Sequence, residues 1–288
     1  MKIAVMTDSN SGIFSETGKK MGVHVVPMPV IIDGETFYEG IDLTLESFFE
    51  RLTGGSEIST SQPSPGELLD MWDRTLKEGY DEIIYIPMSS GLSNSCSSAI
   101  MLAQDYDGKV QVADNHRISV PQYGSVRDAL KLAADGKSAA QIKKALEDAA
   151  YDCSIYIAVD TLEYLKKGGR ITAAAAAVGT VLHIKPILTI QGDKLDSFAK
   201  TRGTKKCRAK IIEAIRHDLT ERFGKEDVSK MRIATAGTFR NPEDAKEWLK
   251  EVETAFPEFE VVYFDLGCSV AAHTGPEAFS AGIYKVLE

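Results

Sequence analysis

A cluster of hydroxyl side chains follows a strongly apolar run in the first third of the chain. Residues 83–86 read Ile-Ile-Tyr-Ile, and six serines and one glycine, Gly91, occur between positions 89 and 98. The apolar run predicts a buried strand, and Ser93 can cap the helix expected to follow, so that backbone N–H groups and hydroxyls converge where the strand ends. Such a point suits an anionic or carbonyl oxygen. The same residues also fit an ordinary strand-to-helix turn with a serine cap.

A second hydroxyl cluster occupies residues 59–64. Ser64 and Glu67, with Pro65 between them, have the spacing of a capping box with proline at the first helical position. Ser64 therefore has a sufficient structural role. Thr60 and Ser61 precede the cap and have no such role, so they either contact a ligand or belong to a solvated loop.

One of the five histidines, His273, has glycines and hydroxyls around it. It lies in residues 266–276, which are expected to form a loop beyond the last strand of the chain. An imidazole in such a setting can bind a ligand or move a proton, but a loop histidine can equally be an ordinary surface residue.

The motifs of several enzyme classes are absent from the sequence. The chain has no G-x-x-x-x-G-K-[ST] for a triphosphate, no G-x-G-x-x-G after the first strand, no H-E-x-x-H for zinc and no G-x-S-x-G elbow. Its four cysteines include no C-x-x-C pair, which argues against a zinc site and fits a reducing compartment. A kinase that acts alone is therefore not expected.

The overall charge also narrows the class of partner. The formal net charge of -9 argues against nucleic acid and anionic membranes, because both are bound by a positive field. The apolar run at the start of the sequence is too short for a signal peptide, and no segment is long enough to span a membrane. We expect a cytoplasmic protein without stable membrane insertion.

The elements that must position these side chains form two α/β domains. Strand and helix patterns alternate through the first 160 residues and predict a three-layer domain with a parallel sheet and right-handed crossovers. Residues 155–159 are expected to be its last strand. From Thr161 onward a hairpin, a long helix and two further strands predict a two-layer α/β domain with a mixed sheet. The expected boundaries are 1–160 with 275–288 for the first domain and 161–274 for the smaller one.

The pattern as a whole resembles the DegV family of bacterial proteins over essentially the full chain. The resemblance rests on short motifs in a specific order, which are Thr7-Asp8-Ser9, Thr60-Ser61-Gln62-Pro63-Ser64, Ser90-Gly91-Leu92-Ser93, Gly168-Gly169-Arg170-Ile171, Ile184-Lys185-Pro186-Ile187-Leu188 and His273-Thr274-Gly275-Pro276. It implies a parallel-sheet domain, a smaller domain inserted before the last helix, and a lipid tunnel between or within them. It also implies fatty acid binding, with the protein as the lipid-carrying subunit of a fatty acid kinase.

The resemblance further implies roles for individual residues. The residues expected to bind a fatty acid carboxylate are Thr60, Ser61, Gly91, Ser93, His273 and Thr274, and the sequence does not decide between Thr60 and Ser61. Arg170 and Arg202 match positions associated with docking the kinase or meeting the phosphoryl group, although both also fit solvated surface charge. No catalytic residue, metal or cofactor is expected, and the fatty acid is the bound ligand.

Simple energetics agree with a lipid ligand. Burying about fourteen methylenes at roughly 0.8 kcal/mol each contributes on the order of 11 kcal/mol, against an association cost of about 4–15 kcal/mol. The tail can therefore hold the ligand while neutral hydroxyls and an imidazole contact the head. Without an ATP motif in this chain, the phosphate must come from a separate kinase, and the acyl phosphate would pass to an acyltransferase of phospholipid synthesis.

Two other functions remain open at this point. Ser93 and His273 could serve a lipid hydrolase or acyltransferase, although the expected elbow motif is missing. The protein could also bind a small polar metabolite, as does the related substrate domain of dihydroxyacetone kinase.

Overall fold

The computed structural model describes residues 1–176, 184–191 and 194–287, and the chain forms two compact units. The first unit contains Met1–Tyr151 and Leu287, and the second contains Asp152–Val286. Each unit has its own sheet and its own apolar core. Within the described ranges, no helix combines the length and the apolar character needed to cross a bilayer.

The first unit is built on a four-stranded parallel sheet. Its strands are β1 (Ile3–Asp8), β2 (Val23–Val26), β6 (Glu82–Ile86) and β7 (Val110–Val112). They lie in the order β2-β1-β6-β7, and all three neighbouring pairs are parallel. The chain moves from β1 to one side and later, through β6, to the other side. The topological switch point therefore lies between β1 and β6.

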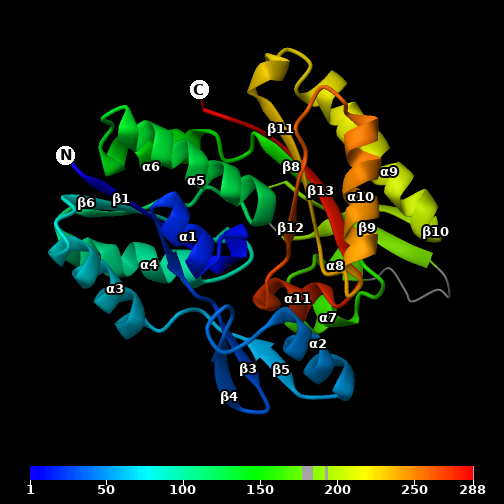
Figure 1. Cartoon of the computed structure of the whole chain (residues 1–288), viewed down its shortest axis with the longest axis horizontal. Helices are drawn as coiled ribbons and strands as arrows, with labels where there is room; N and C mark the ends of the chain where they lie inside the picture. The colour runs from blue at the N-terminus through cyan, green and yellow to red at the C-terminus, as the bar shows by residue number, and fades with distance from the viewer. Residues whose placement is uncertain (177–183, 192–193, 288) are drawn as a thin grey trace. The chain divides into compact units, whose positions relative to one another are not determined.

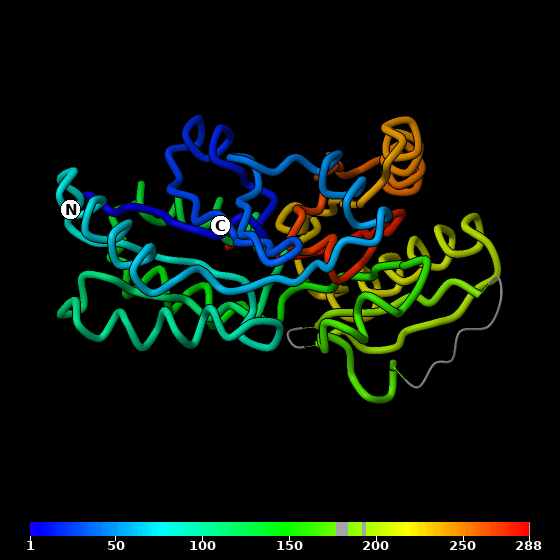
Figure 2. The backbone as a smooth tube through the Cα atoms, turned by 90° about the horizontal axis from the view of Figure 1, so that it is seen from below, coloured from blue at the N-terminus to red at the C-terminus, as the bar shows by residue number. Residues whose placement is uncertain are grey.

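Helices cover both faces of this sheet. They are α1 (Ser15–Met21), α3 (Pro65–Lys77), α4 (Ser95–Ala103), α5 (Ser119–Ala134) and α6 (Ala139–Asp148). A further helix, α2 (Leu45–Gly54), lies between β4 and β5 in the sequence. Helices α5 and α6 lie side by side and pack with α1 on one face, whereas α3 and α4 pack on the other (Figures 1 and 2). The expected three-layer arrangement is confirmed.

A small antiparallel sheet completes the first unit. Its strands are β3 (Pro29–Ile32), β4 (Glu35–Tyr38) and β5 (Ile58–Thr60), in the order β4-β3-β5. Asp33 and Gly34 have φ values of 51° and 86°, which is the conformation of a tight hairpin turn. This turn was expected from the Asp-Gly pair. The sheet matters for function because β5 leads directly into the loop that contains Thr60 and Ser61.

The second unit is built on a six-stranded mixed sheet. Its strands are β8 (Cys153–Ala158), β9 (Ile184–Ile190), β10 (Asp196–Arg202), β11 (Met231–Gly237), β12 (Val262–Asp265) and β13 (Phe279–Lys285). The order is β10-β9-β8-β13-β11-β12, and only β11 and β12 are parallel neighbours. The expected hairpin is the antiparallel pair β9–β10.

The helices of the second unit are α7 (Glu163–Gly168), α8 (Ala173–Ala176), α9 (Thr204–His217), α10 (Pro242–Ala255) and α11 (Cys268–Thr274). Helices α9 and α10 share the main core of the unit with the sheet. Short 3-10 or π turns occur at η1 (Ser9–Ser11), η2 (Gln104–Tyr106), η3 (Asp218–Arg222) and η4 (Val228–Lys230). The part of the expected alanine-rich helix after Ala176 lies outside the described residues.

The domain boundaries differ from those expected. Strand β8, expected as the last strand of the parallel sheet, pairs antiparallel with β9 and β13 in the second unit. The chain does not end on a helix of the first unit, because residues 279–285 form β13, a central strand of the mixed sheet. The units therefore divide at Tyr151 rather than at residue 160, and only the segment after Val286 returns to the first unit.

Candidate functional site

Backbone N–H groups of the turn after β6 are hydrogen-bonded within the turn itself. The N–H groups of Leu92 and Ser93 donate to the Ser89 carbonyl oxygen at 3.1 and 3.2 Å, and the Gly91 N–H donates to Ser89 Oγ at 3.1 Å. These three donors have internal acceptors. The expectation that backbone N–H groups of this turn converge on a ligand oxygen is therefore wrong, and Gly91 contributes shape to the turn rather than a free donor.

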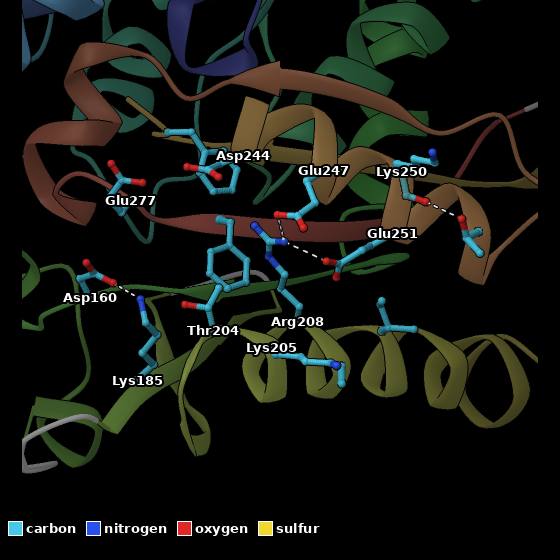
Figure 3. A pocket seen from close by; sticks show the side chains of 15 residues that line it. Asp160, Lys185, Thr204, Lys205, Arg208, Asp244, Glu247, Lys250, Glu251 and Glu277 are labelled. Carbon is cyan, nitrogen blue, oxygen red and sulfur yellow. Dashed lines mark hydrogen bonds and ion pairs between the residues drawn. The ribbon is translucent and has the colours of Figure 1, made fainter. Parts of the chain in front are cut away.

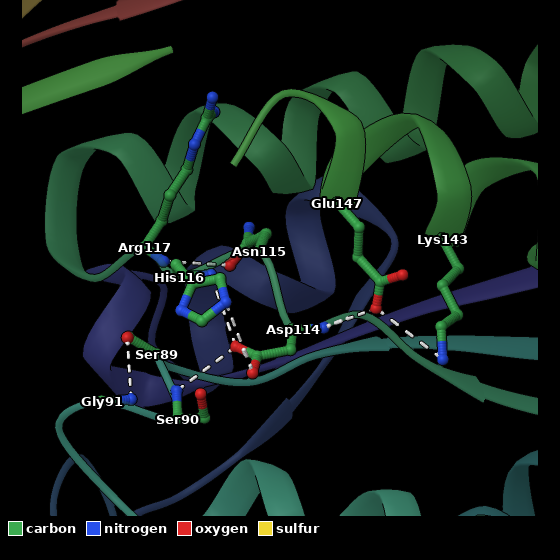
Figure 4. A network of polar contacts seen from close by, with 9 residues as sticks. All are labelled: Ser89, Ser90, Gly91, Asp114, Asn115, His116, Arg117, Lys143 and Glu147. Atoms are coloured by element: carbon green, nitrogen blue, oxygen red, sulfur yellow. Dashed lines mark hydrogen bonds and ion pairs between the residues drawn. The ribbon is translucent and has the colours of Figure 1, made fainter. Parts of the chain in front are cut away.

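The loop after β7 holds the serine turn in place through two hydrogen bonds. The Ser90 N–H donates to Asp114 Oδ1 at 3.3 Å, and the Ser89 N–H donates to the Arg117 carbonyl oxygen at 2.8 Å (Figure 4). Asp114 is itself held by Glu147 of α6, whose Oε1 accepts from the Asp114 N–H at 3.1 Å. The position of the serine turn thus depends on the loop after β7 and, through Glu147, on α6.

Ser93 keeps a donor available in this rigid setting. Its Oγ accepts from the Ser95 N–H at 3.1 Å in the turn just before α4. The N-cap of α4 is Asn94, which makes no side-chain capping bond, so the expected cap at Ser93 is wrong. A hydroxyl that accepts in this way still has an O–H to donate. The side chain is half-buried. Ser93 can therefore donate one hydrogen bond to a carboxylate or carbonyl oxygen.

The strand pattern separates Thr60 from Ser61. Along β5, Ile58 is buried, Ser59 is exposed and Thr60 is half-buried, so Thr60 shares the inward face with Ile58. Ser61 follows the strand, is exposed, and its N–H donates to the Pro29 carbonyl oxygen at 3.3 Å. The inward hydroxyl of this pair is that of Thr60.

A hydrogen bond joins the loop of Thr60 to α4, the helix that follows Ser93. Ser98, one turn into α4, donates from Oγ to Oε1 of Gln62 at 3.1 Å. Gln62 is two residues from Thr60, and the serine turn runs directly into α4. The two hydroxyl clusters predicted from the sequence are thus neighbours within the first unit.

Asp8 fills the end of the sheet between β1 and β6, where ligands often bind in folds of this class. Its Oδ2 accepts from the Met88 N–H at 2.7 Å, and its Oδ1 accepts from Asn10 N–H and Gln122 Nε2, each at 3.1 Å. Burial raises the pKa of this carboxyl to about 6, although these hydrogen bonds act in the opposite direction. The sequence analysis did not single out Asp8 as a buried charge, although the Thr-Asp-Ser sequence after a strand was a signal.

In the second unit, His273 lies on a helix rather than in a loop. It belongs to the last turn of α11, which packs against α7. Burial and, as a smaller effect, the positive charge of Arg170 together lower the pKa of the imidazole to about 4. The side chain is therefore neutral near pH 7, and a neutral imidazole can donate one hydrogen bond and accept another.

Two other predicted contacts are not favoured by their surroundings. Thr274 is only 4% exposed, and its hydroxyl donates to the Val270 carbonyl oxygen of its own helix at 3.3 Å. Arg170 and Arg202 lie at opposite ends of β10, since the Arg170 carbonyl oxygen accepts from Leu195 N–H and Arg202 is the last residue of the strand. Seven residues of strand span about 23 Å. We therefore assign Thr274 to the packing of α11 and treat the half-buried Arg170 and the exposed Arg202 as separate groups.

A pocket of about 980 Å³ lies between α9 and α10 in the second unit (Figure 3). Arg208 reaches into it and contacts Glu247 and Glu251 of α10 at 3.0 and 2.8 Å. Asp160 and Lys185 form a further ion pair at its edge. Nine of the fifteen residues that line this pocket are charged, and we place no acyl chain there.

Comparison with known proteins agrees with the fold. The DegV family model, described as an uncharacterised protein family, matches residues 2–286. A DegV domain-containing protein of Deinococcus radiodurans is 31% identical over 284 residues, which is 98% of each chain.

Two solved structures are similar over the whole chain. A DegV family protein from Thermus thermophilus, described by its fatty acid binding, has a TM-score of 0.88 and 29% identity over 99% of this chain and 100% of its own. DegV from Bacillus subtilis, described as a fatty acid binding protein, has a TM-score of 0.83 and 31% identity over 99% of both chains. The family model and both solved structures match nearly the whole chain, including its parallel sheet and its separate mixed sheet. This chain therefore belongs to the DegV family.

Proposed function

We propose that this protein binds a long-chain fatty acid and presents its carboxylate to a separate ATP-dependent fatty acid kinase. The acyl phosphate then serves an acyltransferase of cytoplasmic phospholipid synthesis. The observation that carries the proposal is the pair of half-buried hydroxyls, Thr60 and Ser93, on neighbouring loops of the first unit. The fatty acid binding described for the similar Thermus and Bacillus proteins supports the same ligand class.

The proposed contacts to the carboxylate are all neutral. Thr60 and Ser93 donate from their hydroxyls, and His273 contributes its uncharged imidazole. Net hydrogen bonds of this kind contribute about 0.5–1.5 kcal/mol each, so most of the affinity must come from the buried acyl chain. A carboxylate held without a cation keeps its oxygen electron density available for phosphoryl transfer. We assign no catalytic residue and no cofactor to this chain.

Lipid binding is tested on purified protein by native mass spectrometry, followed by removal of the lipid and titration with oleate or palmitate. We expect a co-purifying fatty acid and restored binding. Ser93→Ala should weaken oleate binding about two- to tenfold. Ser97→Ala is the matched control, because Ser97 is an exposed serine of the helix that follows Ser93. Protein that purifies empty and takes up neither acid would contradict the proposal.

Presentation to a kinase needs a second assay. The loaded protein is incubated with ATP and a candidate fatty acid kinase, and hydroxylamine is added to convert any acyl phosphate into a hydroxamate and free phosphate. We expect hydroxamate only when both proteins are present. Formation with this chain and ATP alone would argue for an intrinsic kinase. Hydrolysis of a p-nitrophenyl ester that Ser93→Ala abolishes would favour the hydrolase instead.

A further inference from the structure

Helices α7 and α11 are interlocked through two rings and two glycines. A Cβ atom placed on Gly168 of α7 would lie 2.1 Å from Nδ1 and 2.7 Å from Cε1 of His273. A Cβ atom placed on Gly275, which ends α11, would lie 2.5 Å from Cδ2 of Tyr164. Tyr164 and Gly168 are four residues apart and share one face of α7. The ring of His273 therefore packs against Gly168, and the ring of Tyr164 packs against Gly275.

The two glycines differ in what they require. Gly275 has a φ of +73°, so a side chain there would be strained whatever the space around it. Gly168 has no positive φ, and an alanine can adopt its backbone conformation. The three atoms nearest to a Cβ at position 168 all belong to the imidazole of His273. An alanine at this position is therefore a specific probe of that contact.

The backbone of Gly168 also orders the charge next to the imidazole. Arg170 donates from Nη1 to the Gly168 carbonyl oxygen. Arg170 is also the charged group that acts on the pKa of His273, after the larger effect of burial. The glycine thus sets both the surface on which the ring rests and the position of its cationic neighbour.

We infer that Gly168 is a positioning residue for headgroup binding: the missing side chain lets the imidazole of His273 lie against α7 in the one direction that serves the ligand. This inference rests on the proposed function, because it takes His273 to contact the acid group. It assigns a role to α7, which itself supplies no proposed ligand contact. It also explains why the chain has glycine at a helical position whose backbone does not require it.

The test is Gly168→Ala, with Gly66→Ala as the control. Gly66 has no positive φ, and no atom lies within 4 Å of the position of its Cβ. We expect Gly168→Ala to weaken oleate binding about two- to tenfold, as loss of one hydrogen bond would. We also expect the NMR-monitored pKa of His273 to rise from about 4 toward its ordinary value as the ring leaves its site. Gly66→Ala should change neither quantity.

A double-mutant cycle with His273→Ala separates positioning from general damage. In the His273→Ala background, Gly168→Ala should cause no further loss of affinity and a smaller loss of thermal stability, because the space is then empty. An equal loss in both backgrounds, or wild-type affinity and an unchanged His273 pKa in Gly168→Ala, overturns the inference. If the wild-type protein binds no fatty acid, the proposed function fails, whereas the pKa and stability measurements still decide whether Gly168 places the ring.

Discussion

The carboxylate of Asp8 accepts a hydrogen bond of 2.7 Å from the backbone N–H of Met88, and this contact joins the ends of the two central strands of the parallel sheet. The Asp8 side chain therefore occupies the topological switch point between β1 and β6. The pKa of Asp8 is raised to about 6 because the group is buried. Ser93, one of the proposed ligand contacts, lies in the turn that follows Met88 rather than at the switch point itself.

The first prediction concerns the pH dependence of stability. The raised pKa means that the folded protein holds the Asp8 proton more tightly than the unfolded chain does. The contribution of Asp8 to stability is therefore fully present below pH 3.8 and is lost as the pH rises through about 6. A shift from 3.8 to about 6 corresponds to about 3 kcal/mol.

Urea unfolding of the wild type and of Asp8→Asn between pH 4 and pH 8 measures this effect. The difference in unfolding free energy between the two proteins should move by about 3 kcal/mol in favour of the variant as the pH rises. Other titrating groups cancel in the difference. A constant difference across this range would show that Asp8 does not titrate there.

The second prediction concerns Arg117, which is 2% exposed and forms no ion pair among the described residues. Its guanidinium donates to the carbonyl oxygens of Ala149 and Ala150 at 2.5 and 3.3 Å and to Ser125 Oγ at 3.1 Å. Arg117→Met removes three hydrogen bonds of a buried guanidinium and should cost about 3 kcal/mol or more. Chemical unfolding measures the loss. Arg127→Met, an exposed change on α5, should stay within about 0.5 kcal/mol.

The third prediction separates the two hydroxyls at the end of β5. Thr60→Val keeps the branched shape but removes the inward hydroxyl, so oleate affinity should fall about two- to tenfold. Ser61→Ala, at an exposed position, should leave the affinity within about twofold of the wild type. Fluorescence titration of delipidated protein gives both values. The reverse order of effects would place the ligand contact on Ser61.

The fourth prediction concerns the cap of α3. Ser64 Oγ accepts from the Glu67 N–H at 3.2 Å, and Ser64→Ala should cost about 1 kcal/mol of stability. The pKa of Glu67 is lowered by its hydrogen bond to Tyr38 and also by Ser64, so it should rise in this variant. NMR titration follows the pKa. Ser59→Ala, an exposed strand position, should alter neither, and oleate binding should survive both changes.

Local signals predicted much of the fold. The capping box at Ser64 with Glu67 forms as its spacing indicates, and the Asp33–Gly34 turn closes its hairpin. These features depend on residues only a few positions apart. The alternation of strands and helices was likewise sufficient for the parallel sheet.

The errors came from contacts between distant parts of the chain. The apolar run of β8 fits a parallel or an antiparallel sheet equally well, and its partner β13 lies about 120 residues later. Within β13, Gly282 interrupts the run of residues that would otherwise indicate a strand. The loop expected around His273 is a seven-residue helix, and its flanking Gly267 and Gly275 read as loop punctuation.

The site shows the same division. Residue types alone located the serine turn and the loop of Thr60, because hydroxyls gathered after predicted strands. The sequence could not reveal which donors were already used, since the acceptor for Ser90 comes from Asp114 and that for Ser89 from Arg117. The choice between Thr60 and Ser61 likewise needed the register of β5.

The central place of β13 has a consequence for biosynthesis. This strand is translated after every other strand of its sheet, yet it inserts between β8 and β11. Until β13 leaves the ribosome, β10-β9-β8 and β11-β12 form two separate ribbons with unpaired inner edges. Such exposed edges favour wrong strand pairing and chaperone binding. The first unit has no such delay, because all four strands of its parallel sheet precede residue 113. During synthesis, the loops of Thr60 and Ser93 should therefore fold before the region that contains His273.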